Sequence, residues 1–149
     1  MTAPTAQFVG DALSELEKAP LALETDMSRP ICHFEIIGRD PARLRAFYGE
    51  LFGWEYEVGD PATTTVADAG NYGFLADAAN DVHGGVAGGD GFEPRVVVYM
   101  SVEDVESALV AVERLGGTRV MGPEGTPGTI VVGRFTDPEG NLVGLAGPR

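Results

Sequence analysis

An internal repeat constrains the fold of this chain more than any other feature. When the sequence is shifted by 64 residues, segment 31–53 falls on segment 95–117. Each copy has an apolar run typical of a strand, followed by an amphipathic helical pattern that ends at glycine. The equivalent pairs are Asp40 with Asp104, Leu44 with Ala108, Phe47 with Ala111, Tyr48 with Val112, Leu51 with Leu115 and Gly53 with Gly117. We therefore expect a tandem duplication in which both helices bury this same face.

The first copy contains clear boundary signals. Segment 31–38 (ICHFEIIG) is predicted to be a strand, and Asp40 and Pro41 then supply an N-cap and a proline suited to the first helical position. Gly53 stands where a left-handed C-terminal residue belongs. Four later segments are predicted to be short strands between turn residues: WEYEV, TTTVAD (63–68), YGFLAD and HGGVAGG. The glycines of HGGVAGG lack the Lys-Ser/Thr ending of a phosphate loop, so they indicate a loop and a close approach within the sheet.

The second copy repeats this order. RVVVYMSV is predicted to be a strand, EDVESALVAVERLGG a helix, and TRVMGPE, GTIVVGRFTD and NLVGLAG the remaining strands, with DPEGN as the last turn. The chain is thus predicted to be an α+β protein built from two tandem βαβββ modules, at about 31–90 and about 94–147. Residues 1–28 are predicted to be an N-terminal extension, partly helical at DALSELEKA or disordered.

The length and composition of the chain bear on the number of domains, the cellular location and the class of binding partner. A chain of 149 residues with 44% hydrophobic content suits one compact domain, here 29–149. No apolar run approaches a membrane span and no signal-peptide pattern is present, so we expect a cytoplasmic protein without membrane association. Cys32 is the single cysteine, which excludes an internal disulfide and a cysteine-based zinc site. A net charge of −13 disfavours nucleic acid as a partner.

The repeat and three motifs resemble a known superfamily. The motifs are HFEI in the first strand, FYGELFGW at the first helix end and DPEGN before the last strand. In this order and spacing they resemble the vicinal oxygen chelate proteins, the glyoxalase, bleomycin-resistance and extradiol dioxygenase group. The resemblance covers residues 31–147. It implies two modules whose sheets curve around a shared groove, in which substrate or metal binds, and it implies a homodimer.

Strand alternation places one pair of polar residues in that groove. Side chains alternate across a strand, so two sets face opposite sides: His33, Glu35 and Ile37 on one, and Cys32, Phe34 and Ile36 on the other. The more apolar set is expected to meet the helix, which leaves His33 and Glu35 facing the groove. A histidine suits proton transfer near neutral pH, and a nearby carboxylate is expected to raise its pKa. The alternative is a polar pair that satisfies itself or the backbone.

The resemblance implies a metal site whose ligand positions are depleted here. His33 matches the first-strand position that supplies the first ligand in metal-binding relatives. The position of a second histidine is Val97, and the position of the usual carboxylate after DPEGN is Gly144; neither offers a side-chain ligand. We therefore expect no standard metal cofactor. A rearranged set of His33, Glu35 and His83 is the weaker alternative, and His83 is otherwise an exposed turn residue.

Four other residues are candidates for ligand contact. The shift places Tyr99 opposite Glu35, where it either donates to a ligand or fills the core. Trp54 and Tyr56, after the first helix, form either an aromatic wall for a planar ligand or part of the core. Arg134 either reaches the groove or pairs with Asp137 or Glu139.

Two functions of different classes remain. In the first, the protein is an isomerase-like or lyase-like enzyme that acts on a small oxygenated metabolite, with His33 as acid or base and Glu35 as its orienter. In the second, it binds a small molecule without catalysis, as bleomycin-resistance relatives do. The depleted metal positions favour binding, whereas the His33–Glu35 pair favours an enzyme, and the pair tips the balance toward the enzyme.

Overall fold

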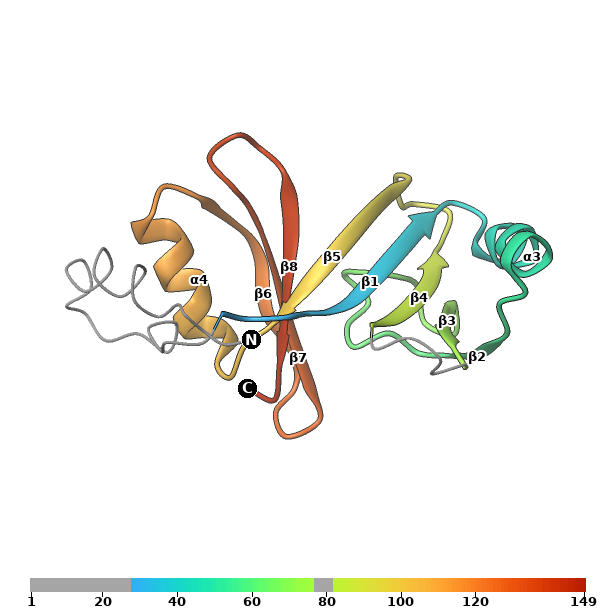
Figure 1. Cartoon of the computed structure of the whole chain (residues 1–149), viewed down its shortest axis with the longest axis horizontal. Coiled ribbons are helices and arrows are strands. Elements are labelled where there is room, and N and C mark those ends of the chain that lie inside the picture. Colours follow the sequence, from blue (N-terminus) through green and yellow to red (C-terminus); the bar gives the residue numbers. More distant parts are fainter. Residues whose placement is uncertain (1–27, 77–81) are drawn as a thin grey trace. The chain divides into compact units, whose positions relative to one another are not determined.

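The computed structural model describes residues 28–76 and 82–149 (Figure 1). The predicted extension at 1–28 lies outside the described residues except for Ser28. Two compact units are present. One unit is Ile31–Tyr99, and the other contains Met100–Arg149 with the described residues up to Pro30. Within the described ranges, no helix is long and apolar enough to cross a membrane.

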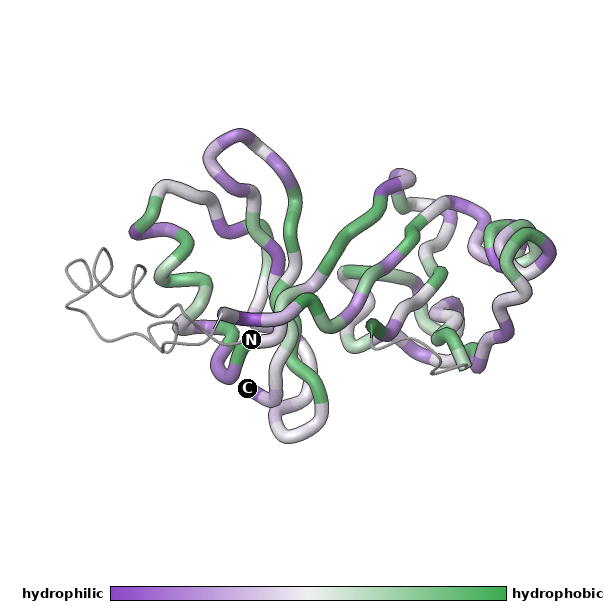
Figure 2. The backbone as a smooth tube through the Cα atoms, in the orientation of Figure 1, coloured by the Kyte–Doolittle hydropathy of each residue, from purple (hydrophilic) through white to green (hydrophobic). Residues whose placement is uncertain are grey.

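The first unit is a sheet with one helix. Its elements are β1 (Ile31–Gly38), α3 (Pro41–Phe52), β2 (Tyr56–Gly59), β3 (Tyr72–Leu75), β4 (His83–Gly88) and most of β5 (Arg95–Ser101). The strand order is β2-β3-β4-β1-β5. β1 and β4 are parallel, whereas β3 is antiparallel to both β2 and β4. Figure 2 shows the hydrophobic run along β5 that the valines of RVVVYMS produce.

The second unit repeats the helix and the three following strands. Its elements are α4 (Val105–Arg114), β6 (Thr118–Thr126), β7 (Ile130–Thr136) and β8 (Leu142–Gly147). These strands are antiparallel in the order β8-β7-β6. α4 buries an apolar cluster against them: Val102, Val105, Ala108, Leu109, Val131 and Leu145. Full burial of a leucine such as Leu109 contributes about 1.5–3 kcal/mol, so this cluster holds the helix on its strands.

The predicted duplication and the α+β class are confirmed. Each half of the chain has the element order βαβββ, with a helix capped by the predicted aspartate. Asp40 Oδ1 accepts the Arg43 N–H at 3.1 Å, and Asp104 Oδ1 accepts the Ser107 N–H at 3.1 Å. Gly53 has the left-handed φ of 73° that the end of the first helix requires.

One predicted strand is wrong. TTTVAD (63–68) forms turns, in which the Val66 N–H donates to the Thr63 carbonyl at 3.2 Å. The Thr63 hydroxyl also accepts the Thr65 N–H at 3.2 Å. Hydrogen bonds from threonine side chains to nearby backbone groups compete with strand pairing. Val66 and Ala67 lie in this turn region, and their apolar side chains are nevertheless buried.

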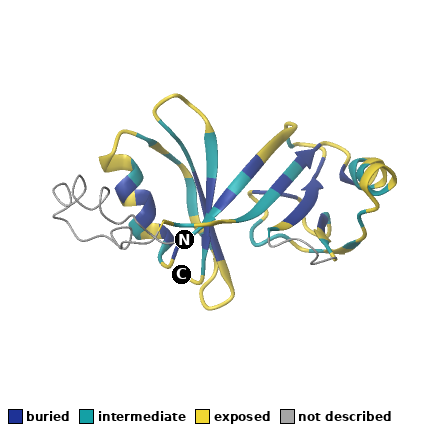
Figure 3. Ribbon diagram, in the orientation of Figure 1, coloured by how far each residue is buried: buried dark blue, intermediate teal, exposed yellow. Residues whose placement is uncertain are grey.

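The predicted helix faces are confirmed only in part. On α3, Phe47 and Leu51 are 56% and 58% exposed, and Leu115 after α4 is 63% exposed. The less exposed positions are 41, 44, 45, 48 and 49 on α3 and 105, 107, 108, 109, 111 and 112 on α4. The predicted stripe is therefore confirmed at positions 44 and 48 on α3 and at 108, 111 and 112 on α4, and it is wrong at 47, 51 and 115. Figure 3 shows more buried surface on α4 than on α3.

A charged residue explains why the face of α3 was missed. The position that Leu109 fills on α4 is Arg45 on α3. Arg45 lies over Gly73, where an added Cβ would meet its Cδ, and its guanidinium donates to the Val86 carbonyl at 3.4 Å. The aliphatic stem of arginine thus covers apolar strand surface while its head bonds the backbone. A hydrophobicity pattern counts such a residue as polar and shifts the predicted stripe.

Candidate active site on the first unit

A hydrogen-bonded chain joins the two polar residues that β1 was predicted to present together. His33 Nε2 lies 2.8 Å from the Tyr72 hydroxyl, and that hydroxyl donates to Glu35 Oε2 at 2.8 Å. The Tyr99 hydroxyl donates to Glu35 Oε1 at 2.7 Å. Glu35 is 4% exposed, so its carboxylate is held in the core by tyrosines from β3 and β5. The structure therefore brings His33, Glu35 and Tyr99 together on one face of the sheet.

The hydrogen bonds from His33 through Tyr72 to Glu35 indicate which nitrogen of His33 carries the proton. The Tyr72 hydroxyl has one proton, which it donates to Glu35. Its oxygen then accepts from His33, so Nε2 carries a hydrogen and Nδ1 carries the lone pair. Within the described residues, Nδ1 has no hydrogen-bond partner. A neutral imidazole held in this way presents one basic nitrogen in a fixed orientation.

Burial controls the charge of this imidazole. Desolvation lowers the pKa of His33 below its ordinary value, against an opposing effect of Glu35 and with a further lowering by His83. Glu35 raises the pKa of His33 as predicted, but the net shift is downward because the cost of burying an imidazolium exceeds the attraction of Glu35. His33 is accordingly a neutral base at neutral pH.

Tyr72 is the residue of this hydrogen-bonded network that sequence analysis missed. It was predicted only as part of the strand YGFLAD, and nothing in its spacing connects it with His33. The strand register determines the face of the sheet on which the Tyr72 side chain lies. Tyr72 pairs with Ala87 on β4, and Ala87 pairs with Ile37 on β1. Partners across a ladder share a face of the sheet, which puts Tyr72 on the face of His33 and Glu35. Strand alternation in YGFL shows that Tyr72 and Phe74 share a face, but only the register shows that this face is the one with His33.

Two glycines of β4 make room for the rings on both faces. A Cβ at Gly85 would meet the Tyr72 ring, at 2.6 Å from Cζ and 2.7 Å from the hydroxyl oxygen. A Cβ at Gly84 would meet the Phe34 ring on the opposite face, at 2.8 Å from Cε1. The prediction that HGGVAGG reflects a close approach within the sheet is confirmed. Gly85 in particular is what allows Tyr72 to reach His33.

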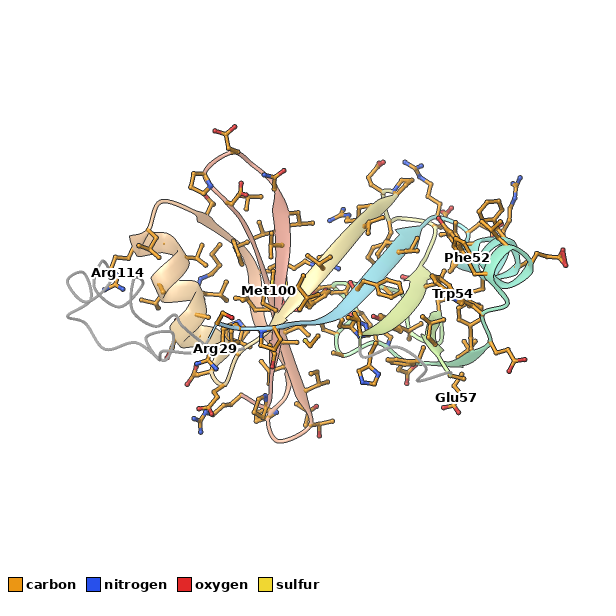
Figure 4. All side chains as sticks on the ribbon, in the orientation of Figure 1. Arg29, Phe52, Trp54, Glu57, Met100 and Arg114 are labelled. Atoms are coloured by element: carbon orange, nitrogen blue, oxygen red, sulfur yellow. The ribbon has the colours of Figure 1, made fainter. Side chains whose placement is uncertain are left out.

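Trp54 and Tyr56 lie away from this face. Trp54 packs on Phe34, Tyr48 and Phe52, with ring centroids 5.8, 5.6 and 5.2 Å apart. Figure 4 shows Trp54 and Phe52 together beside α3. The structure thus places Trp54 in an aromatic cluster with Phe34, whose side chain faces away from His33. Burial raises the pKa of Tyr56, whose hydroxyl is buried without a hydrogen-bond partner among the described residues.

The other predicted residues have different surroundings. Tyr99 is 1% exposed, so its hydroxyl holds Glu35 from within the core. His83 is exposed, as predicted, but it begins β4 beside His33 rather than lying in a turn. Arg134 is buried on β7 of the second unit. Asp137, one of its predicted partners, accepts hydrogen bonds from Asn141 and from the Glu139 backbone.

The donor set does not fit the metal site that the resemblance implies. Val97 is fully buried on β5 and Gly144 lies on β8, and neither has a donor atom in its side chain. Across residues 28–76 and 82–149, no group of three or more His, Cys, Asp or Glu side chains is arranged to hold a metal ion.

Comparison with known proteins identifies the family. Residues 31–145 match the sequence model of the Glyoxalase/Bleomycin resistance protein/Dioxygenase superfamily. The chain belongs to this superfamily. The match spans both βαβββ modules, in agreement with the resemblance carried by HFEI, FYGELFGW and DPEGN. Among curated protein sequences, none matches the chain significantly.

Solved structures of this superfamily share the fold. Methylmalonyl-CoA epimerase from Mycobacterium tuberculosis has a TM-score of 0.59 at 15% identity, over 80% of this chain and 87% of its own. A variant of the Streptomyces coelicolor epimerase, in complex with 2-nitronate-propionyl-CoA, has a TM-score of 0.58 at 14% identity, over 78% and 95%. The Mn(II)-bound glyoxalase from Novosphingobium aromaticivorans is 26% identical, with a TM-score of 0.52. The match covers 79% of the present chain but only 38% of the glyoxalase chain.

Proposed function

We propose that this protein is an enzyme of the isomerase or lyase type that moves a proton on a small oxygenated metabolite. The observation that supports this is the chain from His33 through Tyr72 to Glu35, at 2.8 Å for each hydrogen bond. General bases need a defined orientation and a neutral form at the working pH, and His33 has both. The similarity in fold to epimerases and a glyoxalase makes chemistry beside a carbonyl a reasonable class.

The proposed step assigns a role to each residue. His33 Nδ1 takes a proton from the carbon beside the substrate carbonyl, which leaves an enolate and an imidazolium. When the substrate carbon also carries a hydroxyl group, the same nitrogen then returns the proton to the former carbonyl carbon, and the hydroxyl proton moves to the former carbonyl oxygen. This gives the isomer, and atoms and electrons balance without a redox partner. Tyr72 fixes the ring, and the negative charge of Glu35 stabilises the imidazolium. His33 is the catalytic residue in this proposal, whereas Tyr72 and Glu35 are positioning residues.

Hydrogen exchange tests the proposal without a known product. The protein is incubated in D₂O with a panel of carbonyl compounds that includes methylmalonyl-CoA, and loss of the carbon-bound proton is followed by NMR. His33→Gln is expected to slow exchange by about 100-fold or more, the usual contribution of a general base. The control is Arg114→Gln, an exposed substitution on α4. Unchanged exchange in His33→Gln would refute the proposal.

Binding without catalysis is the second candidate. The buried carboxylate of Glu35 already accepts hydrogen bonds from Tyr72 and Tyr99, an arrangement that also suits a purely structural polar network. If panel compounds bind with defined stoichiometry but no proton exchanges, this candidate replaces the enzyme.

A homodimer and a cytoplasmic location belong to the same proposal. Light scattering of the full chain tests the first, since a mass near twice 15.6 kDa is expected. Fractionation of the native host tests the second.

A further inference from the structure

A hollow on the surface of the first unit lies apart from the His33 site. It is bounded by the end of β1, the first turns of α3 and the start of β5, and its volume is about 650 Å³. This size falls within the range of small-molecule sites. Its walls include Ile36, Leu44, Phe47, Tyr48 and Val96. Because Ile36 alternates with Glu35 along β1, this apolar wall is on the opposite face of the sheet from the carboxylate.

The apolar wall is accessible from outside. Phe47 and Val96 are 56% and 64% exposed, although both are large hydrophobic residues. Exposed apolar side chains that line a concave surface are typical of binding sites. The body of an apolar ligand would cover them.

Three arginines surround the same hollow. Arg39, Arg43 and Arg95 all contribute to its lining, in a chain with only ten basic residues and a net charge of −13. Arg39 forms an exposed ion pair with Glu93 at 2.8 Å. Among the described residues, the guanidinium groups of Arg43 and Arg95 have no acidic partner. Two positive charges are therefore available beside an apolar wall.

The acidic residue in the lining does not cancel these charges. Asp40 is already engaged as the N-cap of α3, where its Oδ1 accepts the Arg43 backbone N–H. Since Arg39 is paired with Glu93, one carboxylate remains against the two guanidinium groups of Arg43 and Arg95, and the hollow has a net positive charge within a strongly acidic protein. The net negative charge of the protein repels an anion from most of its surface, whereas the arginines attract an anion to this hollow.

We infer that this hollow, the α3 pocket, binds a small amphipathic carboxylate. The hydrocarbon body packs against Ile36, Phe47 and Val96, and the carboxylate pairs with Arg43 and Arg95. Guanidinium groups present forked donors that match a carboxylate, and they remain charged at every physiological pH. The α3 pocket is a binding site additional to the proposed enzyme site, and its occupancy does not require His33.

Calorimetry with related aromatic probes tests the charge requirement. Naphthoate carries a carboxylate, naphthamide is neutral with the same body, and naphthyl phosphate carries a different anion. Naphthoate is expected to bind at one site per chain and at least about tenfold more tightly than naphthamide, a ratio that an anion-selective site produces. Tighter binding of naphthyl phosphate than of naphthoate would reassign the pocket to phosphorylated compounds and overturn the carboxylate proposal.

Charge-matched double variants test the residues. Arg43→Gln with Arg95→Gln is expected to weaken naphthoate binding about tenfold or more. Arg114→Gln with Arg149→Gln removes the same charge at exposed positions of the second unit, and it should leave the affinity within about twofold. His33→Gln should bind naphthoate as the unaltered protein does. That result separates this inference from the enzyme proposal.

Three further outcomes would overturn the inference. Equal affinity for naphthoate and naphthamide would show that the arginines do not select an anion. Equal weakening by the two double variants would show only a general effect of net charge. Absence of saturable binding, together with a dimer that Phe47→Asp dissociates, would show that a second copy of the chain covers the pocket.

Discussion

Replacing Gly85 by alanine should disconnect His33 from Glu35 without substituting any of the four residues of the site (His33, Glu35, Tyr72 and Tyr99). The new Cβ would lie 2.6 Å from Cζ of Tyr72 and 2.7 Å from its hydroxyl oxygen, where ordinary carbon contacts are about 3.5–4.0 Å. The ring must therefore move by about 1 Å. Both hydrogen bonds of Tyr72 are 2.8 Å long, and such a shift lengthens them toward the limit of about 3.5 Å.

The expected cost follows from overpacking and from the weakened hydrogen bonds. Overpacking in a filled interior costs about 1–3 kcal/mol, and each weakened hydrogen bond adds about 0.5–1.5 kcal/mol. We expect Gly85→Ala to lower the free energy of unfolding by about 2–5 kcal/mol. Backbone strain does not contribute, since the φ of Gly85 lies outside the left-handed region.

Gly84→Ala is a matched control on the neighbouring residue. Its Cβ would meet the Phe34 ring on the other face of the sheet, so overpacking is similar but Tyr72 stays in place. Urea denaturation measures the stability of both variants, and NMR titration measures the pKa of His33. In Gly85→Ala this pKa is expected to rise toward its ordinary value, because displacement of Tyr72 admits water to the imidazole. In Gly84→Ala it should not change.

Identical titration of His33 in the two glycine variants would show that the contact between Gly85 and Tyr72 does not control the imidazole. A Gly85→Ala variant as stable as the unaltered protein would show that the ring moves without losing its contacts, which contradicts the expected cost. Gly85→Ala combined with Tyr72→Ala checks the cause: removing the ring should relieve the clash, so the two changes should be clearly less than additive.

Three further predictions concern other parts of the chain. Burial lowers the pKa of His33 in the folded protein, so as the pH falls the unfolded protein binds a proton at this residue before the folded protein does. The free energy of unfolding should therefore decrease as the pH drops below about 6.5. Urea denaturation of His33→Gln should show a smaller decrease over this range. Leu109→Ala should cost about 2–5 kcal/mol in urea denaturation, whereas Leu115→Ala, at a 63% exposed position, should stay within about 0.5 kcal/mol; equal effects would contradict the assigned core of the second unit. Asp104→Ala should cost about 1 kcal/mol by removing the cap on the Ser107 N–H, and Asp104→Asn should retain most of that stability if the cap is the cause.

Much of the fold was predictable because its signals are local. Asp40 and Gly53 mark the ends of the first helix through backbone chemistry that needs no distant partner. Segment 63–68 was misassigned because threonine favours strands on average but here bonds its own backbone. The face of α3 was misplaced because Arg45 occupies a position where the second module has Leu109. Patterns based on hydrophobicity fail where a long polar side chain covers apolar surface.

The sequence by itself determined the duplicated βαβββ order and the common face of His33 and Glu35, because helix caps and strand alternation depend on neighbouring residues. Only the tertiary structure decided that Tyr72 links the two residues and that burial keeps His33 neutral. It also gathered Arg39, Arg43 and Arg95 around one apolar hollow. These features arise from the pairing of strands far apart in the chain and from the removal of water around them, neither of which is encoded in local spacing.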